Sequence, residues 1–186
     1  GVGLLRCLKP EAETLIGQLP PAGRELYELL CSDEARVKLQ AAINSSDARL
    51  LAEVHAQFFH TRAGAEATYL LALKYIDRGE PLIGAMLLSK LRQRSWHAER
   101  FEPALSVTLA HCLAQVGMAH EAEQVLRDLA DRPSEARLLF AGRPKDLLSQ
   151  AEQSLAWLEA LSGKPAGKAA AGWLMFRGDP GRNALS

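Results

Sequence analysis

The sequence contains few of the residues that favour β-strands. Val, Ile and Thr number 6, 4 and 4 among 186 residues, whereas Leu and Ala number 32 and 30. β-Branched side chains are restricted in helices and pack well in sheets, while Leu and Ala are strong helix formers. The composition therefore predicts an all-α fold, and the length suits one domain with or without a tail.

Long apolar runs and net charge are also absent. No run of about 18 apolar residues occurs, so no membrane-spanning segment is predicted. The chain begins with Gly, and its first residues lack the charged-then-apolar order of a signal peptide. Lys plus Arg and Asp plus Glu number 22 each, which gives a formal net charge of zero. Such a surface has no net positive field for phosphates, so nucleic acid is not expected as the main partner.

Motifs that carry chemistry are missing as well. The three cysteines, Cys7, Cys31 and Cys112, lie far apart and form no CxxC pair, so neither a disulfide framework nor a zinc site is predicted. His55 and His60 are separated by five residues, which places them about 140° apart on a helix rather than on one face. No glycine-rich phosphate loop and no GxSxG occur. We therefore expect no catalytic residue, metal or cofactor in this chain.

Pro, Gly, Asn and Ser divide the first part of the chain into predicted helices. Prolines cannot continue a helix, and Ser, Thr and Asp are favoured as N-caps. On this basis the expected helices run from Pro10 to before Pro20, from Gly23 to Cys31, from the cap Ser32 or Asp33 to Asn44, from the cap Asp47 to Phe59, and from the cap Thr61 to Gly79. Residues 34–59 are interpreted as a helical pair whose turn is the NSSD segment.

The next part of the chain repeats with an offset of 38 residues. The segment that begins at Tyr69 aligns with the segment that begins at Val107. The aligned pairs are Leu71 with Leu109, Ala72 with Ala110, Gly79 with Gly117, Gly84 with Ala122, Leu88 with Leu126 and Leu91 with Leu129. Each unit reads as a helix, a tight turn at Gly and a second helix that approaches the first through a small residue.

This pattern is similar to the tetratricopeptide repeat. The spacing differs from the usual period of about 34 residues, and Glu99 to Pro103 stand where the motif has its Trp. The resemblance implies a right-handed α-α superhelix of TPR-like hairpins over residues 1–162. In such stacks the first helix of each unit lines the inner surface. The residues expected on this concave face are Glu66, Tyr69, Leu73, Ile76, Asp77, Val107, His111, Ala114 and Gln115.

Beyond Pro133 the pattern weakens. Residues 134–141 suit either a short helix or a short strand. A clearer helix is predicted from Arg143 to Gly163, where it would cap the stack of hairpins. Its apolar face is formed by Leu147, Ala151, Leu155, Leu158 and Leu161. Residues 163–172 have no apolar side chain larger than Ala and are interpreted as a linker.

The C-terminal tail, residues 173–186, has no helical period. It resembles the W-x-x-F-R-G-[ND]-x-x-R-x-[GA] motif that opens the first blade of quinoprotein-like β-propellers. The match is carried by Trp173, Phe176, Arg177, Gly178, Asp179, Arg182 and Ala184. The Arg-Gly-Asp tripeptide within it is explained by this longer motif rather than by cell adhesion. We expect the tail, an irregular C-terminal segment, to dock through Trp173, Phe176, Arg177 and Gly178 on the propeller.

The helical body, over residues 15–130, resembles the region ahead of such propellers in large planctomycete proteins. The features shared are the Leu-Pro opening, Tyr27, Glu34-Ala35-Arg36, the 47–59 helix and His60-Thr61. The resemblance implies the N-terminal region of a longer protein and a location in the periplasm or cell envelope. It also implies a non-catalytic scaffold that binds a protein or peptide, which could be its own propeller. Two alternatives stay open: an accessory region of a quinone-dependent dehydrogenase, and a homo-oligomerisation module. A concave face without a dedicated ligand is a further interpretation.

Overall fold

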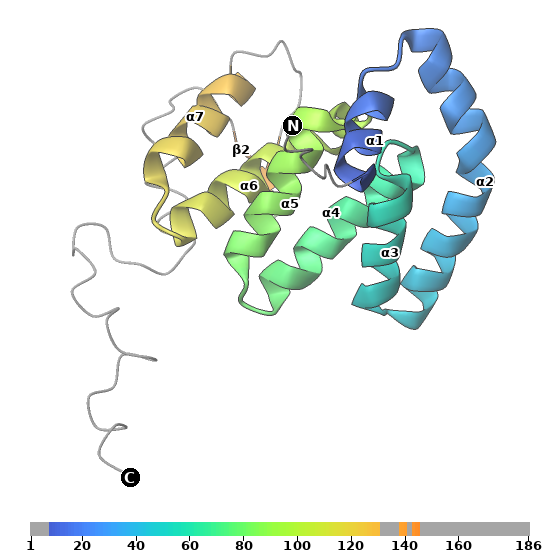
Figure 1. Cartoon of the computed structure of the whole chain (residues 1–186). Coiled ribbons are helices and arrows are strands. Elements are labelled where there is room, and N and C mark those ends of the chain that lie inside the picture. Colours follow the sequence, from blue (N-terminus) through green and yellow to red (C-terminus); the bar gives the residue numbers. More distant parts are fainter. Residues whose placement is uncertain (1–7, 131–137, 141–142, 146–186) are drawn as a thin grey trace, which may run out of the picture.

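The computed structural model describes residues 8–130, 138–140 and 143–145 (Figure 1). The elements are α1 (Leu8–Gly17), α2 (Pro21–Ser45), α3 (Ala48–Phe58), α4 (Arg62–Asp77), α5 (Pro81–Arg94), the 3₁₀ helix η1 (Ala98–Phe101), α6 (Ala104–Gln115), α7 (Ala119–Ala130), β1 (Leu138–Phe140) and β2 (Arg143–Lys145). The body is helical, so the predicted all-α class is confirmed for it. The two short strands pair antiparallel with each other.

Helices α2 to α7 lie side by side in chain order, each packed against the next (Figure 1). Short turns join α2 to α3, α4 to α5 and α6 to α7, so these helices form three hairpins. The predicted pair within residues 34–59 is therefore confirmed as a helical hairpin. A right-handed, TPR-like superhelix remains a prediction.

Two predicted caps are confirmed by their hydrogen bonds. The Asp47 carboxylate accepts from the Arg49 backbone N–H at 2.8 Å, at the start of α3. The Thr61 hydroxyl oxygen accepts from the Gly64 backbone N–H at 3.0 Å, at the start of α4. Each side chain satisfies an amide that has no partner within its own helix, which explains why the helices begin there.

The predicted break at Ser32 and Asp33 is wrong, because α2 continues through both residues. No Pro or Gly occurs between Arg24 and Ser45 to interrupt the ladder of backbone hydrogen bonds. Asp33 turns its carboxylate to the exposed guanidinium of Arg36, at 3.0 Å, instead of capping a new helix. A potential cap residue is tolerated within a helix when its side chain points to solvent in this way.

The backbone reproduces the 38-residue repeat found in the sequence. Gly79 and Gly117 end the first helix of their hairpins with φ of 78° and 85°, which glycine adopts at little cost. Their N–H groups donate to the carbonyls three residues back, at 2.9 and 3.1 Å. The next residues, Glu80 and Met118, both donate five residues back at 2.9 Å. The two predicted hairpins are thus confirmed down to the hydrogen bonds of their turns.

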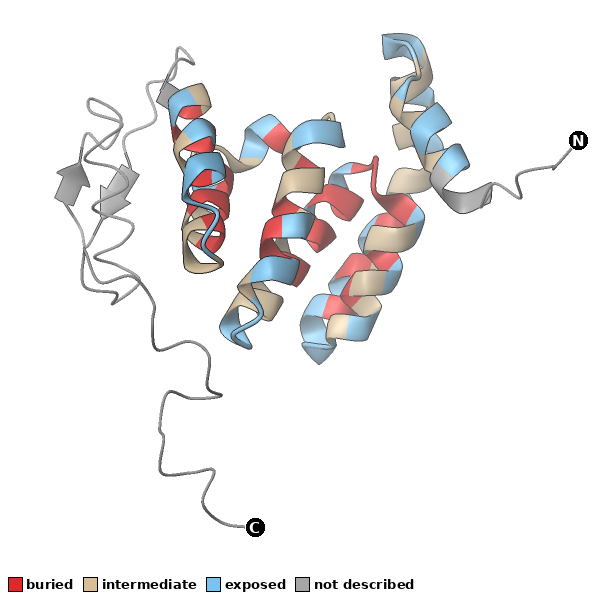
Figure 2. Cartoon of the chain, turned by 60° about the vertical axis from the view of Figure 1, so that its left-hand side comes forward, coloured by how far each residue is buried: buried red, intermediate tan, exposed pale blue. Residues whose placement is uncertain are grey.

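The buried side chains form two clusters between the helices. Figure 2 marks the buried residues in red along these helices. One cluster joins α2, α3 and α4 around Leu39, Leu51, Val54, Phe58 and Leu71. The other joins α4 to α7 through the aligned repeat positions Ala72, Ala110, Leu88, Leu126 and Leu91. Small residues at positions 72 and 110, both fully buried, let paired helices approach closely.

Several predictions concern the C-terminal part of the chain. Leu138–Phe140 is a strand, in agreement with one of the two interpretations of residues 134–141. The predicted start of a helix at Arg143 is wrong, because Arg143–Lys145 forms β2, whose partner strand lies just before it. The rest of that helix, the linker 163–172 and the tail with Trp173, Phe176, Arg177 and Gly178 lie outside the described residues.

Candidate functional site

The residues predicted for a concave face differ in how much of each side chain is accessible. Tyr69, Ile76 and Val107 pack against the core cluster of α4 to α7 and are half-buried. Leu73, His111, Ala114 and Gln115 are also half-buried, whereas Glu66 and Asp77 are exposed.

Two contacts link members of this group to their surroundings. The Tyr69 ring stacks on Phe101 of η1, with ring centroids 5.0 Å apart. The Gln115 amide nitrogen lies 3.0 Å from His111 Nε2, so the amide donates and the imidazole nitrogen accepts. The two exposed members of this face, Glu66 and Asp77, are both acidic.

A hollowed region surrounds Trp96, directly after α5. The Ser95 hydroxyl accepts from the His97 backbone N–H at 3.2 Å, which shapes the turn that carries Trp96. The indole Nε1–H donates to the Gly17 carbonyl of α1 at 3.3 Å. The Arg24 guanidinium of α2 lies 5.0 Å from the indole centroid, a distance at which a cation is attracted by the ring.

Two further rings complete the contacts of Trp96. The Tyr27 ring of α2 meets the indole edge-on at 6.4 Å, and the His60 ring lies at 5.0 Å. Trp96 therefore joins α1, α2, the end of α3 and the end of α5. We call this region the Trp96 junction.

His60 is the buried histidine of the Trp96 junction, with 3% of its surface exposed. Its Nε2 lies 3.0 Å from the Glu13 carbonyl oxygen, which can only accept, so Nε2 carries the proton. Burial lowers the pKa of His60, because the charged imidazolium loses its hydration. The charges of Lys90 and Arg24 act in the same direction, against the opposite effect of Glu13. His60 is consequently neutral at pH 7.

Glu28 connects α2 to two other parts of the junction. One carboxylate oxygen lies 3.3 Å from His97 Nε2, and both oxygens accept from the Arg62 backbone N–H, at 3.1 and 3.3 Å. A carboxylate at the N-terminus of α4 interacts favourably with the helix dipole. Burial lowers the pKa of His97 more than the neighbouring Glu28 raises it, so this imidazole is also neutral at pH 7.

Two pockets lie on either side of the Arg24–Trp96 pair. The first, which we call the Arg94 pocket, has a volume of about 460 Å³. Its lining consists of Glu13, Thr14, Gly17, Arg24, His60, Gln93, Arg94, Ser95 and Trp96. The second, the Leu29 pocket, has a volume of about 520 Å³. Its lining consists of Pro21, Arg24, Glu25, Glu28, Leu29, Ser32, Arg62, Trp96 and His97. None of the residues predicted for the concave face belongs to either set.

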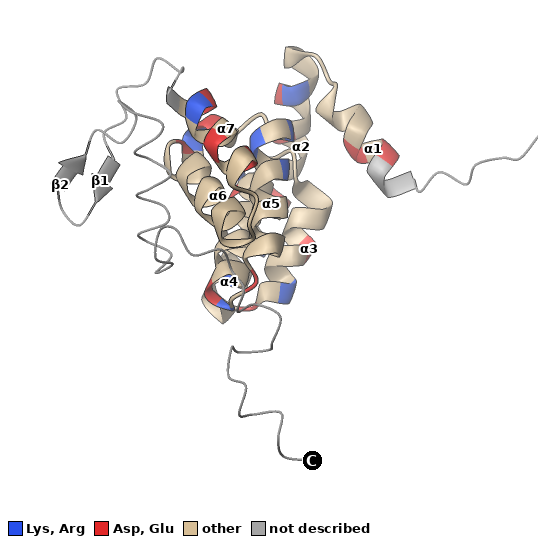
Figure 3. Ribbon diagram, turned by 90° about the vertical axis from the view of Figure 1, so that its left-hand side faces the viewer, with Lys and Arg blue, Asp and Glu red and all other residues tan. Residues whose placement is uncertain are grey.

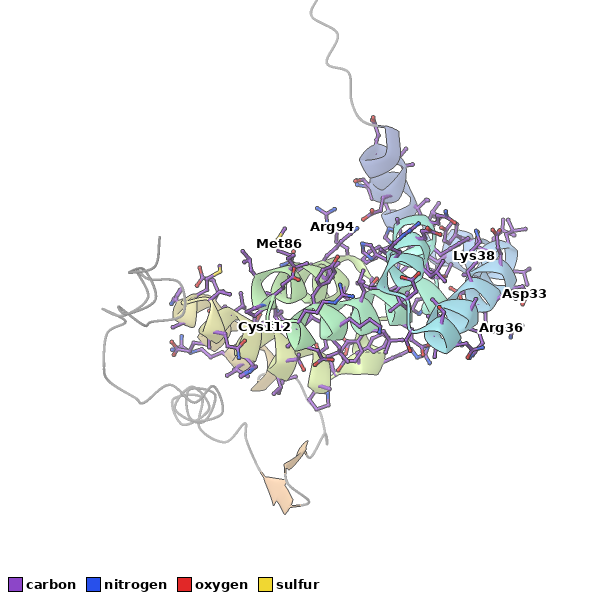
Figure 4. All side chains as sticks on the ribbon, turned by 90° about the horizontal axis from the view of Figure 1, so that it is seen from below. Asp33, Arg36, Lys38, Met86, Arg94 and Cys112 are labelled. Carbon is purple, nitrogen blue, oxygen red and sulfur yellow. The ribbon has the colours of Figure 1, made fainter. Side chains whose placement is uncertain are left out.

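The charges of the two pockets differ. In the described part of the chain, Arg24, Arg62 and Arg94 form no ion pair with a carboxylate, and Figure 4 shows Arg94 extending outward from the end of α5. Glu13 is neutralised by Lys90 at 3.0 Å. The Arg94 pocket thus has an excess of positive charge, although Figure 3 shows both signs interspersed over the body as a whole.

The Leu29 pocket has balanced charges and more apolar surface. Its acidic side chains, Glu25 and Glu28, match the two arginines that line it, Arg24 and Arg62. Pro21, Leu29 and Trp96 supply the apolar part of the lining. A large apolar side chain suits this pocket, and a carboxylate suits the Arg94 pocket.

The described residues do not bring His55 and His60 together as a pair of ligands. His55 Nδ1 lies 2.7 Å from the Thr68 hydroxyl of α4, whereas His60 bonds to α1. No group of three or more His, Cys, Asp or Glu residues suited to a metal ion occurs within the described ranges. Among the helices that the structure describes, none has the length and apolarity needed to cross a bilayer.

The Trp96 junction was not predicted from the sequence. Its contacts between helices join residues 34 to 79 positions apart, such as Arg62 with Glu28 and Trp96 with Gly17. The local signal in the sequence was Trp96, preceded by Arg92 and Arg94 and followed by His97. This combination by itself does not indicate a pocket.

Comparisons with known proteins do not assign this chain to a family: no family model, no curated protein and no solved structure matches it.

Proposed function

We propose that this chain is a non-catalytic scaffold of helical hairpins that binds a segment of another protein. The observation that carries the proposal is the Trp96 junction, where two pockets flank the Arg24–Trp96 pair. Pockets of this size, with a few polar groups beside aromatic and apolar ones, are typical of binding sites.

The chemistry of the two pockets specifies the kind of segment. An Asp or Glu side chain in the Arg94 pocket would meet Arg94 and Arg24, whose guanidinium groups can form paired hydrogen bonds with a carboxylate. A Leu, Met or Phe side chain in the Leu29 pocket would lie against Leu29 and Trp96. The proposed ligand is therefore a short segment that combines acidic and large apolar side chains.

The predicted concave face provides a second surface for the same scaffold. The exposed Glu66 and Asp77 and the half-buried Leu73, His111 and Gln115 would contact a polar segment. The propeller implied by the resemblance of the tail would be a partner of this kind. We propose the Trp96 junction as the main site, because two pockets lie there and Arg94, which lines one of them, forms no ion pair with a described carboxylate.

Trp96 fluorescence tests the proposal directly. In a W157F/W173F background Trp96 is the remaining tryptophan. The probe is the acetylated, amidated peptide Glu-Leu-Glu-Glu-Leu-Glu, and the control peptide has Lys in place of Glu. We expect saturable change of the Trp96 emission with the acidic peptide and none with the basic one. Binding should weaken as salt is added, because surface charges are screened.

Variants then locate the binding surface. Arg94→Gln should lower the affinity for the acidic peptide by roughly tenfold, because one charge-assisted contact is lost. Arg100→Gln, at an exposed arginine outside both pockets, should leave binding unchanged. If Leu73→Asp abolishes peptide binding and Arg94→Gln does not, the peptide binds at the predicted concave face instead of the Trp96 junction. Absence of binding to either peptide would reject the Trp96 junction as a site for acidic segments.

A further inference from the structure

Helix α2 carries an apolar stripe that faces away from the core. Leu26, Leu30 and Val37 are 56%, 73% and 69% exposed. Their spacings of four and seven residues place them on one side of the helix. The buried residues of α2, Ala35, Leu39 and Ala42, occupy the opposite side. We call Leu26, Leu30 and Val37 the outer stripe.

The position of α2 leaves the outer stripe uncovered by other described residues. α2 is the last helix of the row at one end, and its opposite side packs against α3 and α4 (Figure 1). Figure 4 shows Asp33 and Arg36 on the outer side of α2, away from the neighbouring helices. Exposed contiguous apolar residues with polar neighbours commonly mark an interaction surface.

The charges within the outer stripe favour one kind of partner. Asp33 and Arg36 lie between Leu30 and Val37, and their side chains are 86% and 78% exposed. They carry opposite charges three residues apart, so the centre of the stripe has no net charge. A strongly acidic or basic partner would therefore meet one repulsive group at this centre.

We propose that the outer stripe is covered by α2 of a second copy of this chain, in an antiparallel pair about a twofold axis. The axis would pass beside Asp33 and Arg36, so that Asp33 of each copy faces Arg36 of its partner. In this register Leu30 of one copy lies within one helical turn of the other copy's Val37. A parallel pair would place like charges opposite each other, which is unfavourable.

The length of α2 is sufficient for such a pair. Its 25 residues extend over about 37 Å, which is about three and a half heptads of an antiparallel two-helix contact. A closed dimer uses the same patch on both copies, so a self-complementary stripe is what twofold symmetry requires. The proposal is independent of the pockets at the Trp96 junction, because the outer stripe lines neither of them.

Sedimentation equilibrium of the chain tests the pairing. We expect a dimer that dissociates on dilution, and a monomer for Leu30→Asp/Val37→Asp with unchanged far-ultraviolet circular dichroism. The matched control is Met86→Asp on α5, where the native side chain is also 65% exposed; this variant should remain dimeric. A monomeric wild type at about 100 μM, or a dimer that survives the double substitution, would overturn the proposal.

Charge exchange tests the antiparallel register. Asp33→Arg and Arg36→Asp should each weaken the dimer by at least about tenfold, since both place like charges across the axis. An equimolar mixture of the two variants should form a heterodimer, and the Asp33→Arg/Arg36→Asp double variant should recover the homodimer. Unchanged dimer dissociation constants in all three variants would reject this arrangement of the two copies.

Discussion

Replacement of Gly64 by Ala should be among the most destabilising small changes in this protein. Gly64 is buried in the first turn of α4. A Cβ atom there would lie 1.7 Å from the Phe58 carbonyl oxygen, 2.3 Å from its carbon and 2.8 Å from the Phe59 nitrogen. All three are backbone atoms, so no change of rotamer relieves the overlap, and the end of α3 must move away from α4.

The change in the free energy of unfolding of Gly64→Ala is the sum of opposing contributions. Ala gains about 0.5–1 kcal/mol over Gly within a helix. Overpacking costs about 1–3 kcal/mol or more when the backbone must shift. That shift also disturbs the Thr61 cap, since the Gly64 N–H donates to its hydroxyl at 3.0 Å, and a lost cap costs about 1 kcal/mol. We expect a net loss of about 2 kcal/mol in the free energy of unfolding.

Urea unfolding followed by circular dichroism measures this change against a matched control. Gly23 lies within α2, and a Cβ there meets its nearest atoms at 3.4 Å, an ordinary contact. Gly23→Ala should therefore be neutral or stabilising by up to about 1 kcal/mol. Stabilities of the two variants within about 1 kcal/mol of each other would refute the predicted close approach of α3 and α4.

Three other predictions concern packing, thiol reactivity and pH. A Cβ at Gly84 would lie 2.6 Å from Ile76 Cγ1, so the cost of Gly84→Ala should fall by about 1 kcal/mol in an Ile76→Ala background, measured by a double-mutant cycle. Burial raises the pKa of the Cys112 thiol to about 11, which makes this thiol unreactive in the folded protein. In a C7S background, Ellman's reagent should label the half-buried Cys31 in the folded protein and Cys112 only when the protein unfolds. Burial lowers the pKa of His111 below its usual 6.5, so the unfolded state binds a proton more readily and stability is lost as pH falls below about 6.5. His111→Gln should make the decrease in unfolding free energy from pH 7.5 to 5.5 shallower; an identical slope would contradict the burial of this imidazole.

The hairpins could be predicted from the sequence because their signals are local. Asp47 and Thr61 cap the amides that lie two or three residues after them. Gly79 and Gly117 end helices through hydrogen bonds that span three to five residues. Such interactions depend only on residue type and on short spacings along the chain. The same local signal therefore occurs in both repeat units, which are offset by 38 residues.

The Trp96 junction could not be predicted because nothing local defines it. Its hydrogen bonds depend on α1 returning to the end of α5, and this return is set by how α2 to α5 pack. Lys90, for example, meets Glu13 across 77 residues and also lies over the Phe59 ring at 4.4 Å. Residues with such separations carry no shared period in a single sequence.

Helix α2 shows why its boundary was predicted wrongly and why its surface is informative. Its apolar residues occupy two opposite sides, the core side at Ala35 and Leu39 and the outer stripe at Leu30 and Val37. The break was predicted because Ser32 and Asp33 are favoured N-cap residues, and two opposed apolar stripes leave no single-faced periodicity that would indicate a continuous helix instead. A helix at the end of a row needs only one apolar side for its own core. The described residues of one copy leave the second side uncovered, and a second α2 packed against it would give this side a role.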